Sequence, residues 1–312
     1  MKRKWSALRA MLVMAGFLLP CAAFADQPFS QLIIISGSLS DVGNYASVHG
    51  WFPAPFFEFR STNGPNLDDY FAEALNFPDK PSGHLTGPVQ GNNFSVFQSL
   101  AGGHGPEDLP AQVQAYLDSR GGMADPKALH LLLIAGTDVI NAMQEPDDVK
   151  AHHMIDAAVI GNENAIRTLV QAGAKTIFAP NFSDLGSTPG AINSHLVARA
   201  TRVSVEYNTK YAAMLDRVER ELDFDLIRWD FFTYTHQFLA KAHELGFTNT
   251  TQACVDLSAS GDCGDLSKFV FLADFFPTTR VHRFFAMAMV QAFLEHQKER
   301  CRREGHRDCD RY

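Results

Sequence analysis

Ser38 is the residue of this sequence best placed to act as a nucleophile. It lies in the stretch "IIISGSLSDVGNY" (residues 33–45), in which a run of isoleucines leads into glycine, serine and asparagine. A short β-branched run that ends in small polar residues is typical of a buried strand followed by a turn. In a parallel sheet such a turn lies at the carboxyl ends of the strands, where sites form. A serine hydroxyl there needs a nearby base before it can attack an acyl group.

The rest of the chain alternates between strand and helix patterns, which predicts the framework around Ser38. Buried strands are predicted within residues 31–36, 128–138, 175–180 and 225–232. Amphipathic helices are predicted within residues 66–78, 108–122, 154–174, 194–222 and 278–296. This alternation predicts an α/β fold, a three-layer α/β/α sandwich with a mainly parallel sheet. The turns at Ser38, Gly136 and Asn181, which follow strands, should then converge.

The first 25 residues have the pattern of an export signal. Four basic residues (Lys2, Arg3, Lys4 and Arg9) precede the apolar stretch "AMLVMAGFLLP", which is too short to span a bilayer as a helix, and the small-residue site "AFA" follows. We therefore expect residues 1–25 to be a bacterial Sec-type signal peptide and residues 26–312 to form one domain that is secreted or periplasmic. No later segment is apolar enough to predict a transmembrane span.

The segment after residue 25 is strongly acidic. Removing the four basic residues of the signal segment from the 27 of the chain leaves 23, against 35 Asp and Glu. This excess of negative charge disfavours nucleic acids and anionic membrane surfaces as partners. It does not exclude a lipid-like ligand, because an acyl chain enters a protein through apolar contacts.

Four cysteines follow the signal segment, all near the C-terminus. In an exported protein an even number of cysteines indicates disulfides, and four cysteines allow three connectivities. We favour Cys254–Cys263 and Cys301–Cys309, because each bond would close a short loop. A zinc site is the alternative, although these loops lack the Cys-x-x-Cys spacing of structural zinc. We expect neither a metal nor a cofactor.

Six blocks of the sequence resemble one known family and occur in that family's order. They are "SLSDVGN", "NGPNLDDYFAEAL", "LPAQVQAYL", "NFSDLGSTP", "GFTNTTQAC" and "FPTTRVHRFFA". On these blocks the chain resembles the secreted GDSL or SGNH lipases and esterases, in the bacterial branch with lysophospholipases and acyltransferases. The resemblance implies a flavodoxin-like, SGNH-type sheet. It also implies ester hydrolysis by a serine, a histidine base, an acid that orients the histidine, and an oxyanion hole.

The two N-terminal catalytic blocks of that family are altered in this chain. The nucleophile block reads "SGSL", which keeps Ser38 but has Gly37 where the family has an acid. The glycine block reads "NNFSVFQSL", with Phe97 and Gln98 where the family has glycines. The loss of glycine amides and of a carboxylate beside the serine predicts a rebuilt site.

The later catalytic blocks are altered as well. The "GxND" block begins at Gly136 and has Asp138 where the family has the asparagine of the oxyanion hole. The "DxxHPT" block reads "ADFFPT", so that Ala273 stands in place of the acid and Phe276 in place of the base. An ionised Asp138 would repel an oxyanion, and removal of one oxyanion donor alone lowers the rate by roughly 10²–10³.

These changes favour a weakly active or non-catalytic member of the family, a pseudoenzyme with an apolar cleft. Ser38 would then be a vestigial nucleophile. The former oxyanion hole and pocket would contain Gly136, Asp138, Phe97 and Phe276, with Phe276 over Ser38. Such a cleft would bind an acyl or other hydrophobic ligand, or a protein partner.

An active serine esterase or lysophospholipase with relocated catalytic partners is the alternative. Asp274 lies one residue beyond the lost acid, and His282 matches a second family histidine that is not the base. His84 and His104, in glycine-containing loops, are further candidates. An imidazole nitrogen within hydrogen-bond reach of Ser38 Oγ would favour this alternative.

Overall fold

The computed structural model describes residues 29–50, 54–257, 262–305 and 309 of the 312-residue chain. The predicted signal segment, residues 1–25, lies outside the described residues. The centre of the described part is a parallel sheet in the order β1 (Leu32–Ser36), β2 (Leu129–Leu133), β3 (Thr176–Pro180) and β4 (Asp225–Trp229). The strands begin level with one another, since Leu32 pairs with Leu129, Leu129 with Thr176, and Thr176 with Asp225. Their carboxyl ends therefore meet at one edge, as the sequence predicts.

A short segment extends the sheet beyond β1. The amide of Ile34 donates to the carbonyl of Asn92 at 3.0 Å, and the amide of Phe94 donates to the carbonyl of Ile34 at 2.7 Å. Ile34 and Asn93 form a parallel bridge. With this segment counted as an edge strand, the strands numbered along the chain lie across the sheet in the flavodoxin-like order 2-1-3-4-5.

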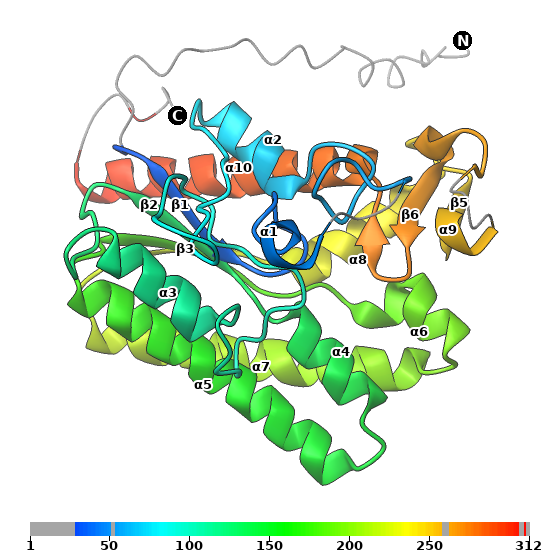
Figure 1. Ribbon diagram of the computed structural model, residues 1–312, viewed down its shortest axis with the longest axis horizontal. Helices are drawn as coiled ribbons and strands as arrows, with labels where there is room; N and C mark the ends of the chain where they lie inside the picture. The colour runs from blue at the N-terminus through cyan, green and yellow to red at the C-terminus, as the bar shows by residue number, and fades with distance from the viewer. Residues whose placement is uncertain (1–28, 51–53, 258–261, 306–308, 310–312) are drawn as a thin grey trace, which may run out of the picture.

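Helices cover both faces of the sheet, which makes three layers (Figure 1). One face packs against α3 (Leu109–Asp118), α4 (Gly136–Gln144), α5 (Asp148–Gln171) and α7 (Val197–Glu221). The other face packs against α2 (Leu67–Ala74), α8 (Phe231–Lys241) and α10 (Thr279–Arg303). Alternate residues of β1 belong to opposite cores: Ile33 and Ile35 to the first, Leu32 and Ile34 to the second. The α/β/α prediction is confirmed.

A second, smaller sheet forms one wall of the site and was not predicted from the sequence. It consists of β5 (Asn249–Ala253), β6 (Phe269–Ala273) and β7 (Phe276–Pro277), with β6 and β7 antiparallel. Short helical segments connect the larger elements: α1 (Ala46–His49), η1 (Leu185–Ser187), α6 (Pro189–Asn193), α9 (Cys254–Leu257) and η2 (Leu266–Lys268).

Several predicted boundaries differ from the structure; α5, for example, begins at Asp148 and not at residue 154. The turn expected at Gly136 is the beginning of α4. The strand expected to reach residue 232 ends at Trp229, because the Asp230 carboxylate accepts the Thr233 amide at 3.0 Å and caps α8. Helix α10 continues past residue 296 because His296 and Arg300 both contact Asp225 of β4, at 2.8 and 3.1 Å.

The cysteines lie in the two predicted pairs. Cys254 and Cys263 have Cα atoms 5.5 Å apart, and Cys301 and Cys309 have Cα atoms 5.6 Å apart, so each pair is at disulfide-bonding distance. Among the described residues, no helix combines the length and the apolar character needed to cross a membrane.

Candidate functional site

A cavity of about 70 Å³ lies at the carboxyl edge of the sheet. Each strand of the main sheet contributes to it through the segment that follows: Gly37 and Ser38 after β1, Gly136 after β2, Phe182 after β3, and Phe231 after β4. The small sheet closes it with Phe271, Phe275 and Phe276. Ser38 and Gly136 therefore converge at the cavity as predicted. From the third predicted turn, Phe182 lines the cavity in place of its neighbour Asn181.

Ser38 keeps the place of a nucleophile but has an unusual partner. Its hydroxyl oxygen accepts a hydrogen bond from the backbone amide of Gln98 at 2.9 Å. Gln98 has φ +64°, the left-handed conformation that glycine adopts at no steric cost. The loop thus follows a backbone path suited to glycine although the side chain is glutamine. Among the residues that the structure describes, no imidazole nitrogen is hydrogen-bonded to Ser38.

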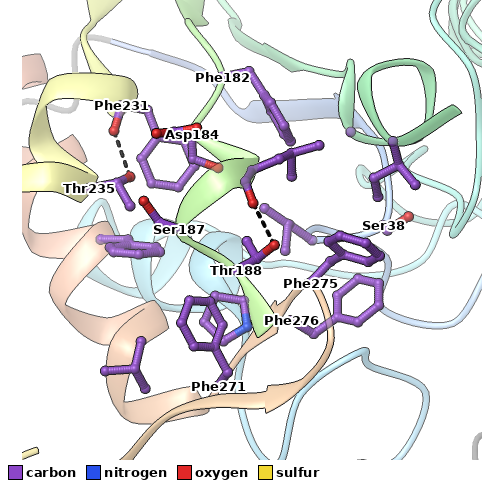
Figure 2. Close-up of a pocket in the computed structure, with 18 of the residues that line it drawn as sticks. Ser38, Phe182, Asp184, Ser187, Thr188, Phe231, Thr235, Phe271, Phe275 and Phe276 are labelled. Atoms are coloured by element: carbon purple, nitrogen blue, oxygen red, sulfur yellow. Dashed lines mark hydrogen bonds between the residues drawn. The ribbon is translucent and has the colours of Figure 1, made fainter. Parts of the chain in front are cut away.

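Phe275 and Phe276 lie beside Ser38 at the turn between β6 and β7 (Figure 2). Both side chains line the cavity. The ring of Phe276 also packs on the ring of Phe97, with centroids 5.5 Å apart. Phe275 is seated on Gly190 of α6, where an added Cβ would come within 2.4 Å of its ring. The turn is therefore held against α6 by an aromatic contact that requires glycine.

Asp138 and Phe97 do not line the cavity, unlike Gly136 and Phe276. The Asp138 carboxylate instead accepts the backbone amides of Ala101 at 2.8 Å and Gly102 at 3.1 Å. Burial raises the pKa of the Asp138 carboxyl to about 6, although these amides lower it. The Asp138 carboxylate is thus bound by loop amides and is not part of the cavity lining, so its place in a former oxyanion hole stays a prediction. The ring of Phe97 packs between Phe276 and Tyr45 instead of entering the cavity.

The relocated catalytic candidates also lie away from the cavity lining. Asp274 is exposed, and its backbone carbonyl accepts the Gly190 amide at 2.9 Å. His282 is fully buried in α10, and burial lowers the pKa of its imidazole to about 3. The Nδ1 of His84 lies 2.6 Å from the buried Ser82 hydroxyl, and His104 is exposed.

The polar groups of the cavity wall bond mostly to the protein itself. The Thr235 hydroxyl donates to the Phe231 carbonyl at 2.7 Å, and the Thr188 hydroxyl donates to the Leu185 carbonyl at 2.6 Å (Figure 2). The Asp184 carboxylate accepts the Gly186 amide at 2.8 Å and lies 3.1 Å from His236 Nε2. Because these hydrogens and lone pairs are already bound, the wall offers a ligand mainly carbon surface.

Sequence reasoning missed most of that wall. Phe231, Thr235, Phe238, Phe271 and Phe285 line the cavity but lie in segments read as strand, unassigned or helix core. The available signal was the position of Phe231 near the carboxyl end of the predicted strand segment 225–232, at the edge of the sheet where sites form. Periodicity does not separate a phenylalanine that faces a cavity from one packed in the core.

Comparison with known proteins decides the family. A family model described as GDSL-like Lipase/Acylhydrolase matches residues 38–289. The chain belongs to this GDSL-like family. Its parallel sheet, with helices on both faces and Ser38 after β1, is the fold that the resemblance implied.

The curated relatives of this GDSL-like chain are distant and differ in length. It is 22% identical to GDSL esterase/lipase At5g03820 of Arabidopsis thaliana, over 82% of this chain and 88% of the relative. It is 24% identical to the thermolabile hemolysin of Vibrio parahaemolyticus, over 87% of this chain and 65% of the relative. It is 26% identical to Lipase 1 of Photorhabdus luminescens, over 52% of this chain and 23% of the relative. The chain thus spans under a quarter of Lipase 1 and under two thirds of the hemolysin.

A solved structure of similar extent also matches. It is a lipolytic protein of the G-D-S-L family from Veillonella parvula, with 11% sequence identity and a TM-score of 0.40, over 84% of this chain and 97% of that chain.

Proposed function

We propose that this GDSL-like protein is an exported, non-catalytic member of its family that binds an acyl or similarly apolar chain beside Ser38. The observation that carries the proposal is Phe276. It stands where the family motif has the histidine base, and it lines the cavity together with Ser38. A serine hydroxyl without a base is a weak nucleophile near neutral pH.

The chemistry of the wall supports an apolar ligand. Seven phenylalanines line the cavity: Phe182, Phe231, Phe238, Phe271, Phe275, Phe276 and Phe285. The threonine hydroxyls donate to backbone carbonyls and add little polarity. An alkyl chain gains roughly 0.8 kcal/mol for each buried CH₂ group, whereas a polar chain would lose its hydration without replacement bonds.

Export is supported by the two cysteine pairs at disulfide-bonding distance. Disulfides persist in the bacterial periplasm and outside the cell and are rare in reducing compartments. The signal-like pattern of residues 1–25 agrees with this proposal.

One contact favours the alternative, an active serine esterase. The Gln98 amide points at the Ser38 hydroxyl, near the place that an oxyanion donor would occupy. The alternative still needs a base. His282 is buried and Asp274 is exposed away from the cavity, so neither supplies one in this conformation.

A binding experiment tests the apolar-ligand proposal with a matched pair of variants. A Cβ at Gly136 would meet the Phe182 ring at 3.5 Å, an ordinary contact, so Gly136→Leu adds carbon to the cavity without forcing the backbone. Gly87→Leu is the control, because Gly87 is exposed and a Cβ there meets nothing within 4 Å. A fluorescent long-chain fatty acid should bind to the wild type and to Gly87→Leu with equal affinity. Gly136→Leu should bind it at least about tenfold more weakly, a loss of about 1.4 kcal/mol. Equal binding to all three proteins would exclude this cavity as the site.

A hydrolysis experiment separates binding from catalysis. Wild type and Ser38→Ala are compared on a short-chain p-nitrophenyl ester and on a lysophospholipid. We expect equal, near-background rates, because an unactivated hydroxyl contributes almost nothing to acyl transfer. A large rate that disappears in Ser38→Ala would establish the esterase instead.

A further inference from the structure

Four charged residues form a cluster next to the turn that carries Ser38. We call Arg60, Asp68, Asp69 and Asp79 the carboxylate cluster. Arg60 makes a two-pronged contact with Asp69, with Nε 2.6 Å from Oδ2 and Nη2 2.7 Å from Oδ1. This is the strong planar geometry of a guanidinium and a carboxylate, so Arg60 is committed mainly to Asp69.

The other two carboxyl groups of the cluster are buried with too few hydrogen bonds. Asp68 is 0% exposed, and neither of its oxygens makes a hydrogen bond of normal geometry among the described residues, although the Ser40 hydroxyl lies near enough to lower its pKa. Asp79 Oδ1 accepts the Asn93 side-chain amide at 2.8 Å, while its buried Oδ2 has no partner in the same set. Buried polar atoms are nearly always paired, so these three oxygens need an explanation.

Charge balance supplies the explanation. Three carboxylates face one guanidinium. Arg60 lowers the pKa of Asp79, no positive group is among the causes of the Asp68 shift, and Lys80, which follows Asp79, is exposed. Asp41 of the Ser38 turn is occupied by the amides of Gly43, Asn44, Tyr45 and Phe97. Glu58 adds another negative charge beside Arg60. On α10, which packs against α2, His282 is buried, and a pKa of about 3 keeps its imidazole neutral.

Protons can neutralise the remaining carboxylates. Among the described residues, no three acidic, histidine or cysteine side chains are arranged to hold a metal ion. Burial raises the pKa of Asp68 to about 7, with a smaller contribution from Asp69, while the Ser40 hydroxyl lowers it. Burial together with Asp69 and Asp68 holds the pKa of Asp79 well above its usual value.

The cluster is bonded to the turn that presents Ser38. The Asn93 side-chain amide donates both to Asp79 Oδ1 and to the Ser40 carbonyl, each at 2.8 Å. Asn66, which caps α2 and precedes Asp68, donates to the Asp41 carbonyl at 3.4 Å. Repulsion inside the cluster would therefore act on residues two and three positions after Ser38.

We propose that the carboxylate cluster is a pH-sensitive switch, which holds the Ser38 turn closed while Asp68 and Asp79 carry protons and loosens it when they ionise. This goes beyond ligand binding, and its test needs no ligand. A rise in pH would then loosen the fold first at the Ser38 turn, and the effect would be transmitted through α2 and the segment that contains Asn93.

The direction of the pH effect follows from the raised pKa values. The folded protein holds both protons more tightly than the unfolded chain does. For Asp68 the stabilising effect is complete below pH 3.8 and is lost as the pH rises through about 7. For Asp68 alone, the folding equilibrium constant should fall by about a hundredfold between pH 5 and pH 8. Asp79, whose pKa is also raised by burial, adds a loss in the same direction.

The experiment compares wild type with Asp68→Asn, because asparagine is uncharged and has nearly the same shape as a protonated aspartate. Asp118→Asn, on an exposed position of α3, is the control. Unfolding by urea is followed at pH 5 to 8, and hydrogen exchange, corrected for its intrinsic pH dependence, reports the amides of residues 38–45. In wild type and in Asp118→Asn, both stability and protection of this turn should fall toward pH 8. Over this range the folding equilibrium constant of Asp68→Asn should fall by a factor about a hundred times smaller than that of wild type.

Two outcomes would overturn the proposal. One is an unchanged pH slope in Asp68→Asn. The other is a flattened slope without any change in the pH-dependent protection of residues 38–45, which would mean that the cluster titrates but does not act on the turn. Asp79→Asn gives a second test if Asp68→Asn does not fold, and it should likewise reduce the loss of stability as the pH rises.

Discussion

If Ser38 is inactive because it lacks a base, as proposed, placing the motif acid and base in the β6–β7 turn should produce ester hydrolysis. The double variant Ala273→Asp/Phe276→His is suited to this test. Ala273 and Phe276 are directly paired across the antiparallel turn, so side chains at the two positions start from Cβ atoms about 4.5–5.5 Å apart. An aspartate at 273 can therefore reach and orient an imidazole at 276. Phe276 already lines the cavity with Ser38, so the imidazole enters at the correct depth.

The expected gain comes from the base. General base catalysis contributes about 10²–10⁴ in rate, and this is the rise we expect in kcat/KM for a short-chain p-nitrophenyl ester. Phe276→His alone should give a smaller rise, since its imidazole lacks an orienting acid. Adding Gly37→Asp should be tolerated, because a Cβ at Gly37 would lie 3.6 Å from Ser99 Oγ and 3.7 Å from Ile134, both ordinary contacts.

The control is the same double variant with Ser38→Ala, which must return the rate to the wild-type level. A folded double variant that shows no Ser38-dependent increase would refute the reasoning. It would mean that the turn no longer follows the path needed to bring a base to Ser38. Circular dichroism and thermal unfolding should confirm that each variant is folded before its rate is interpreted.

Three further predictions concern the scaffold. Asp138→Asn should remove about 2 kcal/mol of the stability that wild type loses between pH 4 and pH 7, because the raised pKa of about 6 favours folding at low pH and this advantage disappears as Asp138 ionises; urea titrations that are identical to wild type at every pH would contradict this. Gly190→Ala should lower stability by about 1–3 kcal/mol through its clash with Phe275, and Phe275→Ala should relieve most of this cost; an additive double variant would argue against the contact. Peptide mapping without reduction should recover the two short-range cysteine links and no link between the early and late pairs.

Hydrophobic patterning predicts the main sheet well because its strands are short and buried on both faces. Each of β1 to β4 lies within a predicted segment, and the predicted parallel order follows from the helices between them. The misplaced boundaries have local causes that periodicity does not report. Asp230 caps α8 directly after β4, and Asp225 holds the charged end of α10 through contacts between residues far apart in sequence.

The site was predicted in part for a related reason. Ser38, Gly136 and Phe276 line the cavity together, and their positions depend on strand ends and on a motif. Asp138 is not part of the lining, because its direction depends on the amides of Ala101 and Gly102, which a different loop presents. The carboxylate cluster was not foreseen either, since α2 shows only an ordinary amphipathic pattern and nothing in it indicates that Asp68 is buried.

The hydroxyls of Thr188 and Thr235 donate to backbone carbonyls of the protein, which affects the energetics of ligand binding. A wall with few open donors or acceptors gives a ligand head group little to bind, so affinity should increase with chain length and depend weakly on the head group. Transfer of each further methylene from water contributes roughly 0.8 kcal/mol until the cavity is full. Calorimetry would then register a negative heat-capacity change that grows with chain length, the thermodynamic mark of apolar burial. Under the proposed function, the cavity would therefore select its ligands by hydrocarbon length.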